Sequence, residues 1–127
     1  MKYSKIVRIV FMSLPKAGTV LCMETSIDAN IIFAGGSDSM DLMVGMAKLF
    51  ALTFDEDISF ITSLVLPSSN MNTMGVADIK RMADRDVLFV GTNSNLFVVE
   101  WTGTNFEILN HIEDIHTCIF FSPELTL

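Results

Sequence analysis

The sequence predicts an all-β fold built from repeated antiparallel sheets, and two observations support this prediction. The chain aligns with itself: VLCMETSIDANIIFAGGSD, which begins at Val20, runs parallel to VADIKRMADRDVLFVGTNS, which begins at Val76, at an offset of 56 residues. Short runs rich in β-branched and aromatic residues also alternate with turn residues along the chain. Self-similarity at a fixed spacing is the sequence signature of architectures that stack similar units.

The first half of the chain contains five predicted strands. Glycines close the third strand, and the acidic run DED, residues 55–57, separates the fourth and fifth as a hairpin turn. The predicted strands cover residues 6–12, 20–25, 30–35, 49–54 and 58–66.

The second half repeats this order of strands and turns. Turns are predicted at residues 83–86, 92–94 and 102–104, where Asp, Asn, Ser, Thr and Gly gather. The predicted strands cover residues 76–79, 87–91, 96–101, 106–109 and 116–121.

Two segments also have some helical character. Residues 41–50 place Leu42, Met46 and Leu49 at helical spacing, although Gly45 weakens a helix there. Residues 76–84 have apolar residues three apart, but the aligned segment from Val20 is a poor helix former, so a strand is favoured.

Charge and hydropathy exclude two classes of partner. The formal net charge is −7, from 15 acidic and 8 basic residues, and no basic stripe suited to phosphates is present, so we expect no nucleic-acid partner. The mean hydropathy is high, at +0.49, yet Arg8 and Lys48 interrupt the longest apolar stretches. We therefore expect no membrane span, and instead apolar surface reserved for partners.

The two cysteines, Cys22 and Cys118, lie in apolar, strand-like surroundings without the spacing of a zinc or redox motif. This usage is typical of small buried hydrophobic residues in a reducing compartment, so we expect an intracellular, cytoplasmic location.

Without a nine-residue insertion in the first copy, the offset of 56 becomes a repeat of 47 residues. A four-stranded repeat of 40 to 50 residues favours a β-propeller over other all-β folds. The repeated sequence pattern resembles that of WD-repeat β-propellers. Each copy has a valine-led strand, an Asp-containing turn, and an apolar strand that ends in glycine, here IIFAG and VLFVG. Where that family has Trp-Asp, the two copies read LT and VE, and Ala34 and Val90 replace its serine. The resemblance therefore implies degenerate blades held by apolar packing, with Trp101 capping the outer side of its sheet.

The resemblance also implies where blades begin and end. Blade one would cover about 19–66 and blade two about 76–110, while strands 6–12 and 116–121 would belong to neighbouring blades. Because a propeller closes with about 4 to 8 blades, this chain is incomplete on its own. We expect the missing blades from a longer protein, from another chain or from further copies.

No motif for catalysis, a cofactor or a metal ion emerges, so we expect neither an enzyme nor a cofactor. The segment HIEDIH, residues 111–116, holds potential metal ligands, but its spacing separates the two histidines and favours a polar loop. The glycines after residue 34 are interpreted as a turn and not as a phosphate-binding loop. Residues 55–57, DED, are interpreted as a solvated hairpin tip and not as a calcium site.

The candidate contact surface includes an insertion in blade one that has no counterpart in blade two. Blade one carries nine extra residues between its second and third strands, within about 37–47, and the resemblance places this loop on the same rim as the inter-blade loop 67–75. Methionine recurs on adaptable binding surfaces, although packing over the blade end explains the pattern equally well. The predicted partner-binding residues are Met40, Leu42, Met43, Met46, Met71 and Met74.

The function predicted from these observations is a non-catalytic protein–protein interaction scaffold within a larger complex. Two alternatives stay open. One is a ligand-binding or hydrolytic propeller whose site is completed by blades outside this chain. The other is a β-sandwich ligand-binding domain, in which residues 41–50 would lie across a closed core.

Overall fold

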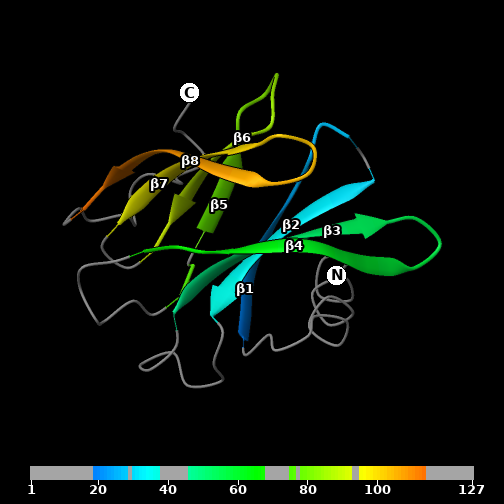
Figure 1. The fold of residues 1–127 in the computed structure, drawn as a ribbon, viewed down its shortest axis with the longest axis horizontal. Helices are drawn as coiled ribbons and strands as arrows, with labels where there is room; N and C mark the ends of the chain where they lie inside the picture. The colour runs from blue at the N-terminus through cyan, green and yellow to red at the C-terminus, as the bar shows by residue number, and fades with distance from the viewer. Residues whose placement is uncertain are drawn as a thin grey trace.

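The described part of the chain forms two four-stranded antiparallel sheets, which confirms the all-β prediction (Figure 1). This computed structural model describes residues 19–28, 30–37, 46–67, 75–76, 78–92 and 95–113, and within those ranges no helix occurs. The predicted strands 6–12 and 116–121 lie outside the described residues, as do residues 41–45 of the first helix-like segment. Residues 47–50 of that segment belong to a strand.

Each sheet is a meander in which every strand pairs with the next one in the chain. The first sheet contains β1 (Thr19–Thr25), β2 (Ile31–Ser37), β3 (Ala47–Phe54) and β4 (Ile58–Val65). The second contains β5 (Asp78–Arg81), β6 (Val87–Gly91), β7 (Leu96–Trp101) and β8 (Phe106–Ile112). The predicted bounds of β6 and β7 are confirmed to the residue. Strand β5 begins two residues later than the predicted strand 76–79, and β8 extends three residues beyond the predicted strand 106–109.

Short polar side chains close the turns between these strands. After β1, the Ser26 hydroxyl accepts a hydrogen bond from Asp28 N–H, and the Asp28 carboxylate accepts one from Asn30 N–H. After β7, the Thr102 hydroxyl accepts from Asn105 N–H, and Gly103 takes a φ of +104°, which favours glycine. The acidic residues 55–57 form the predicted turn between β3 and β4.

The internal repeat extends to the hydrogen-bonded register of the sheets. Cys22 pairs with Gly35 across β1 and β2, and Asp78 pairs with Gly91 across β5 and β6, each at the offset of 56 residues. In the next pair of strands Gly35 faces Leu49, whereas Gly91 faces Leu96. Between these equivalent register positions the first sheet therefore contains nine more residues than the second, and four of them, Gly36, Ser37, Ala47 and Lys48, belong to β2 and β3.

A β-bulge recurs at the same place in both sheets. The register between β3 and β4 shifts between Ala51 and Leu52 and leaves Ile61 without a partner residue. The register between β7 and β8 shifts between Val98 and Val99 and leaves Leu109 in the same position. Bulges bend a strand, so the last pair of strands bends at the same place in both sheets, while the first sheet has a further bulge between Val20 and Cys22 of β1.

The two sheets stack head to tail. One face of the first sheet, called its front face, packs against the opposite kind of face of the second sheet, called its back face. The front face of the first sheet presents Cys22, Ile31, Phe33, Leu49 and Ala51. The back face of the second sheet presents Ile79, Leu88, Val90, Phe97, Val99 and Trp101.

The repeat shows that these two faces are not equivalent. The counterparts of Phe33 and Leu49 in the second sheet are Phe89 and Leu96. Both alternate with core residues along their strands, so they belong to the front face of the second sheet, away from the first. A two-fold pairing would bring equivalent faces together, whereas here the second sheet follows the first as a displaced copy.

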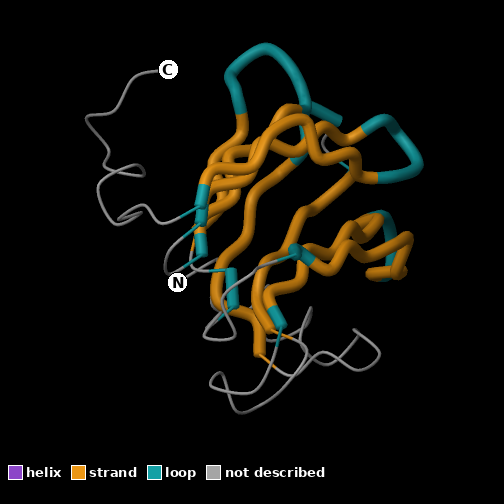
Figure 2. Tube along the Cα trace, turned by 60° about the vertical axis from the view of Figure 1, so that its left-hand side comes forward, coloured by secondary structure: helices purple, strands orange, loops and turns teal. Residues whose placement is uncertain are grey.

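The stack is closest along the first strand of each sheet, where β1 and β5 meet. The described residues consist of strands and loops alone (Figure 2). The last strands, β4 and β8, carry most of the exposed large hydrophobic residues. Sheets that meet at their first strands and expose their last ones are blade-like.

Trp101 corrects one prediction, because it does not cap the outer side of its sheet. Its side chain is 6 % exposed and lies between the sheets, 5.7 Å from the ring of Phe33 and 4.9 Å from that of Phe106, measured between centroids. The alternation along β7 decides this, since Trp101 follows Phe97 and Val99 on the same face.

Candidate binding site

The predicted methionine surface is described at one position. Met46 stands directly before β3 and is 46 % exposed. The other predicted contact residues lie outside the described residues and stay predictions; they are Met40, Leu42, Met43, Met71 and Met74.

The described ends of the two predicted contact loops meet at one edge of the molecule. Leu66 N–H donates to the carbonyl of Ala47, at 2.9 Å, and Val76 N–H donates to the carbonyl of Gly36, at 3.0 Å. The insertion between β2 and β3 and the loop between β4 and β5 are therefore anchored beside each other.

The seam between the sheets at this edge is tightly packed around Gly35. A Cβ atom at Gly35 would lie 2.5 Å from Cγ1 of Val76 and 2.9 Å from Sγ of Cys22. Val76 is the residue aligned with Val20 at the start of the repeat. The glycine is required here because only a residue without a side chain lets the second unit approach.

Cys22 belongs to this seam as a partly buried residue that packs against the core. Burial, with a smaller contribution from the Asp78 carboxylate, raises the pKa of its thiol from 9.0 to about 12. Because the thiolate is the reactive form, a thiol with this pKa is inert near neutral pH. Cys118 lies outside the described residues.

The opposite edge of the seam is polar and links the turns of the two sheets. The Asp86 carboxylate accepts hydrogen bonds from the Ser26 hydroxyl and from Ile27 N–H, at 2.5 and 2.9 Å. Arg81 Nε donates to the carbonyl of Thr25, at 2.7 Å. We call this set of contacts the latch. Hydrogen bonds that involve a charged group are stronger than neutral ones, so the latch fixes how the sheets align.

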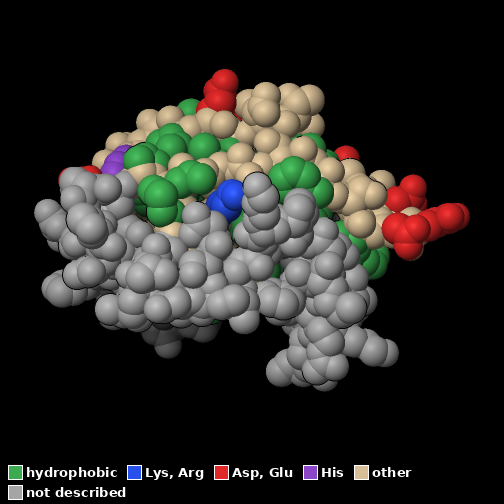
Figure 3. All heavy atoms as spheres, turned by 60° about the horizontal axis from the view of Figure 1, so that its bottom comes forward, with side chains coloured by type: hydrophobic (Ala, Val, Ile, Leu, Met, Phe, Trp, Pro, Cys, Tyr) green, Lys and Arg blue, Asp and Glu red, His purple; other side chains and the backbone are tan. Residues whose placement is uncertain are grey.

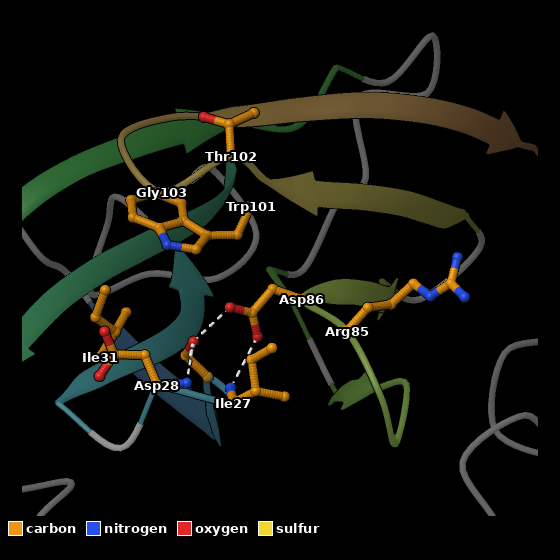
Figure 4. A pocket seen from close by; sticks show the side chains of 9 residues that line it. Ile27, Asp28, Ile31, Arg85, Asp86, Trp101, Thr102 and Gly103 are labelled. Atoms are coloured by element: carbon orange, nitrogen blue, oxygen red, sulfur yellow. Dashed lines mark hydrogen bonds between the residues drawn. The ribbon is translucent and has the colours of Figure 1, made fainter.

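A pocket of about 420 Å³ opens beside the latch (Figure 4). Three turns meet there: the β1–β2 turn, the β5–β6 turn and the start of the β7–β8 turn. The lining residues are Ser26, Ile27, Asp28, Ile31, Arg85, Asp86, Trp101, Thr102 and Gly103.

The lining of this pocket is apolar at its base and acidic on its wall. Trp101 and Ile31 supply apolar surface, and Asp28 and Asp86 supply carboxylates. Arg85 extends away from the pocket in Figure 4 and pairs with the neighbouring Asp84, at 3.3 Å, both side chains being exposed. Acidic side chains also project where the β3–β4 turn lies, at the right of Figure 3.

Sequence reasoning missed this pocket because it lies at the end opposite the predicted methionine surface. The turns themselves were predicted, but Ser26 and Asp86 are 60 residues apart, and no local pattern shows that they touch. The usable signal was the single tryptophan next to a turn.

The HIEDIH segment shows no metal site in its described part. His111 stacks on the ring of Phe97, with centroids 4.1 Å apart, and its Nε2 lies 3.9 Å from the Glu113 carboxylate. Among the described residues, no three His, Cys, Asp or Glu side chains lie close enough together to hold an ion. His116 lies outside the described ranges.

Comparison with known proteins gives no relative: no family model, no curated protein and no solved structure matches this chain. The resemblance to WD-repeat propellers therefore stays a prediction. In the described ranges there is also no helix of the length and apolarity needed to cross a bilayer.

Proposed function

We propose that this chain is a non-catalytic protein-interaction scaffold whose two sheets are consecutive blades of a propeller-like assembly. The observation that carries this proposal is the head-to-tail stacking of two sheets with the same register. A head-to-tail contact joins two different faces, so it leaves one face of each kind for a further unit.

The second sheet supports the proposal because its front face keeps the apolar character of the first. Phe33 corresponds to Phe89, Ile31 to Val87 and Leu49 to Leu96. Phe33 is fully buried by the second sheet, whereas Phe89 is only partly buried; Val87 and Leu96 beside it are buried within this chain. The apolar surface around Phe89 is the proposed association site for the sheet of another blade.

The contact surface for a different partner protein is proposed at the methionine-rich edge. The loops that contain Met40, Met43, Met71 and Met74 are anchored there side by side, and Met46 is exposed. The net charge of −7 and the inert Cys22 thiol fit a protein partner, rather than nucleic acid, in a reducing compartment.

Light scattering of the purified chain tests the assembly. We expect a mass above the 14.1 kDa of one chain, because the front face of the second sheet associates. Phe89→Glu should lower that mass by placing a charge on this face, whereas Phe60→Glu, at an exposed aromatic residue on β4, should not. A cooperatively folded monomer at all concentrations would overturn the proposal.

A further inference from the structure

The pocket at the latch is preformed by the stacking of the two sheets. Its walls come from turns of both sheets, and the Asp86 carboxylate holds Ser26 and Ile27 of the first sheet in place. Its volume of about 420 Å³ is within the range of ligand sites, roughly 300 to 1,000 Å³. A site formed in advance binds without the cost of ordering its walls.

The apolar part of the pocket is rigid at its base and open at its rim. Trp101 is held by the rings of Phe33 and Phe106, so the indole has one fixed position. Ile27 is 55 % exposed at the tip of the β1–β2 turn, beside the pocket. An apolar side chain that enters the pocket would cover both residues and remove apolar surface from water.

The pocket also contains a hydrogen-bond donor. The indole N–H of Trp101 forms no hydrogen bond with any residue that the structure describes. In Figure 4 the indole nitrogen faces the side of the pocket where Ile31, Asp28 and Asp86 lie. The unpaired indole N–H can donate to an acceptor, and a backbone carbonyl of a bound segment supplies one.

The carboxylates on the wall of the pocket determine the charge of the ligand that fits there. Asp28 is exposed, and Asp86 lies across the seam from it, while the Arg85 guanidinium is paired with Asp84 and directed away. The pocket wall is therefore acidic and has no cation from Arg85 beside it, while the Asp86 oxygens also accept the hydrogen bonds from Ser26 and Ile27. Together with the net charge of −7, this favours a basic group.

We propose that this pocket binds a short, extended segment of a partner protein in which a basic side chain stands next to an apolar one. The apolar side chain lies against Trp101 and Ile27, the basic group lies between the Asp28 and Asp86 carboxylates, and a backbone carbonyl accepts from the indole. This inference rests on the proposed scaffold function and names the chemistry of one partner segment.

Trp101 is the only tryptophan of the chain, so its fluorescence reports on the pocket directly. The full chain is titrated with a capped five-residue peptide that has lysine between two leucines. A second titration uses the same peptide with glutamate in place of the lysine. We expect a saturable change in emission with the lysine peptide and at least tenfold weaker binding of the glutamate peptide. Added salt should weaken the first interaction, because exposed charges are screened.

Two variants with the same change of charge separate the pocket from the general acidity of the chain. Asp28→Asn keeps an oxygen for Asn30 N–H and should weaken the lysine peptide about threefold to fivefold, the range of an exposed ion pair. Asp57→Asn, in the β3–β4 turn outside the pocket, should leave the affinity unchanged.

Three outcomes would overturn the pocket proposal: no saturable change in emission, equal affinity for both peptides, or equal weakening by both variants. The scaffold proposal is tested separately by the mass of the chain. A chain that assembles through Phe89 but ignores the lysine peptide would remove only the pocket proposal.

Discussion

The first and second sheets have the same register and the same bulge, yet their front faces have different surroundings. Phe33 and Ala51 are fully buried, while their counterparts Phe89 and Val98 are only partly buried. The local sequence is similar in both places, so the difference comes from what stacks on each face. Under the proposed function, the front face of the first sheet forms the junction within the chain, and the front face of the second sheet receives a further sheet.

The latch differs in the opposite way, because it is not repeated. The counterparts of Ser26 and Asp86 in the other sheet are Met82 and Asn30, and the counterpart of Arg81 is Thr25. Apolar faces therefore recur in both units, whereas the charged contacts belong to this junction alone. Apolar packing supplies association that many sheets can share, and the latch supplies the choice of neighbour.

The largest expected effect breaks the comparison at Phe33. Phe33→Ala should cost about 3 to 5 kcal/mol of unfolding free energy, because a buried ring is replaced by a cavity. Phe89→Ala, at the equivalent and less buried position, should cost about half of that or less. Urea unfolding of both variants gives the two values, and equal costs would show that both front faces are covered alike.

A smaller effect is expected at the tight seam. Gly35→Ala places a methyl group 2.5 Å from Cγ1 of Val76, so it should cost about 1 to 3 kcal/mol through overpacking. Gly103→Ala has no neighbour within 4 Å and should cost about 1 kcal/mol, from its positive φ alone. A double variant, Gly35→Ala with Val76→Ala, should recover part of the loss if the clash is the cause.

A further effect appears only at high pH and concerns Cys22, whose counterpart is Asp78. Burial raises the pKa of the folded Cys22 thiol to about 12, above the value of 9.0 in an unfolded chain. The contribution of the neutral thiol to stability is therefore complete below pH 9 and is lost as the pH rises toward 12. Denaturant unfolding at several pH values measures this loss.

The control for this prediction is Cys22→Ser, whose stability should fall less over the same interval of pH. Both proteins carry Cys118→Ser, so that the other thiol does not contribute. Parallel curves for the two proteins would contradict a raised pKa at Cys22.

The sequence revealed the strands, the repeat and the insertion because these depend on local alternation and on turn residues. The glycine and phenylalanine positions of IIFAG and VLFVG occupy equivalent register positions in β2 and β6. The latch and the bulges at Ile61 and Leu109 were not predicted, since they depend on contacts between segments distant in the chain. The predicted placement of the Trp101 side chain was wrong for the same reason. The sequence does not show which face of the second sheet packs against the first sheet, where its partner Phe33 lies.

The repeated bulge has a consequence for the pairing of sheet edges between molecules. The last strands, β4 and β8, carry exposed hydrophobic residues such as Phe60, Ile108 and Ile112, which would invite strands of other molecules to add at the edge. The displaced residues Ile61 and Leu109 interrupt the regular spacing that continuous cross-β growth requires. Cross-β growth is thus hindered at the edges of the sheets, while their apolar faces keep the ability to stack.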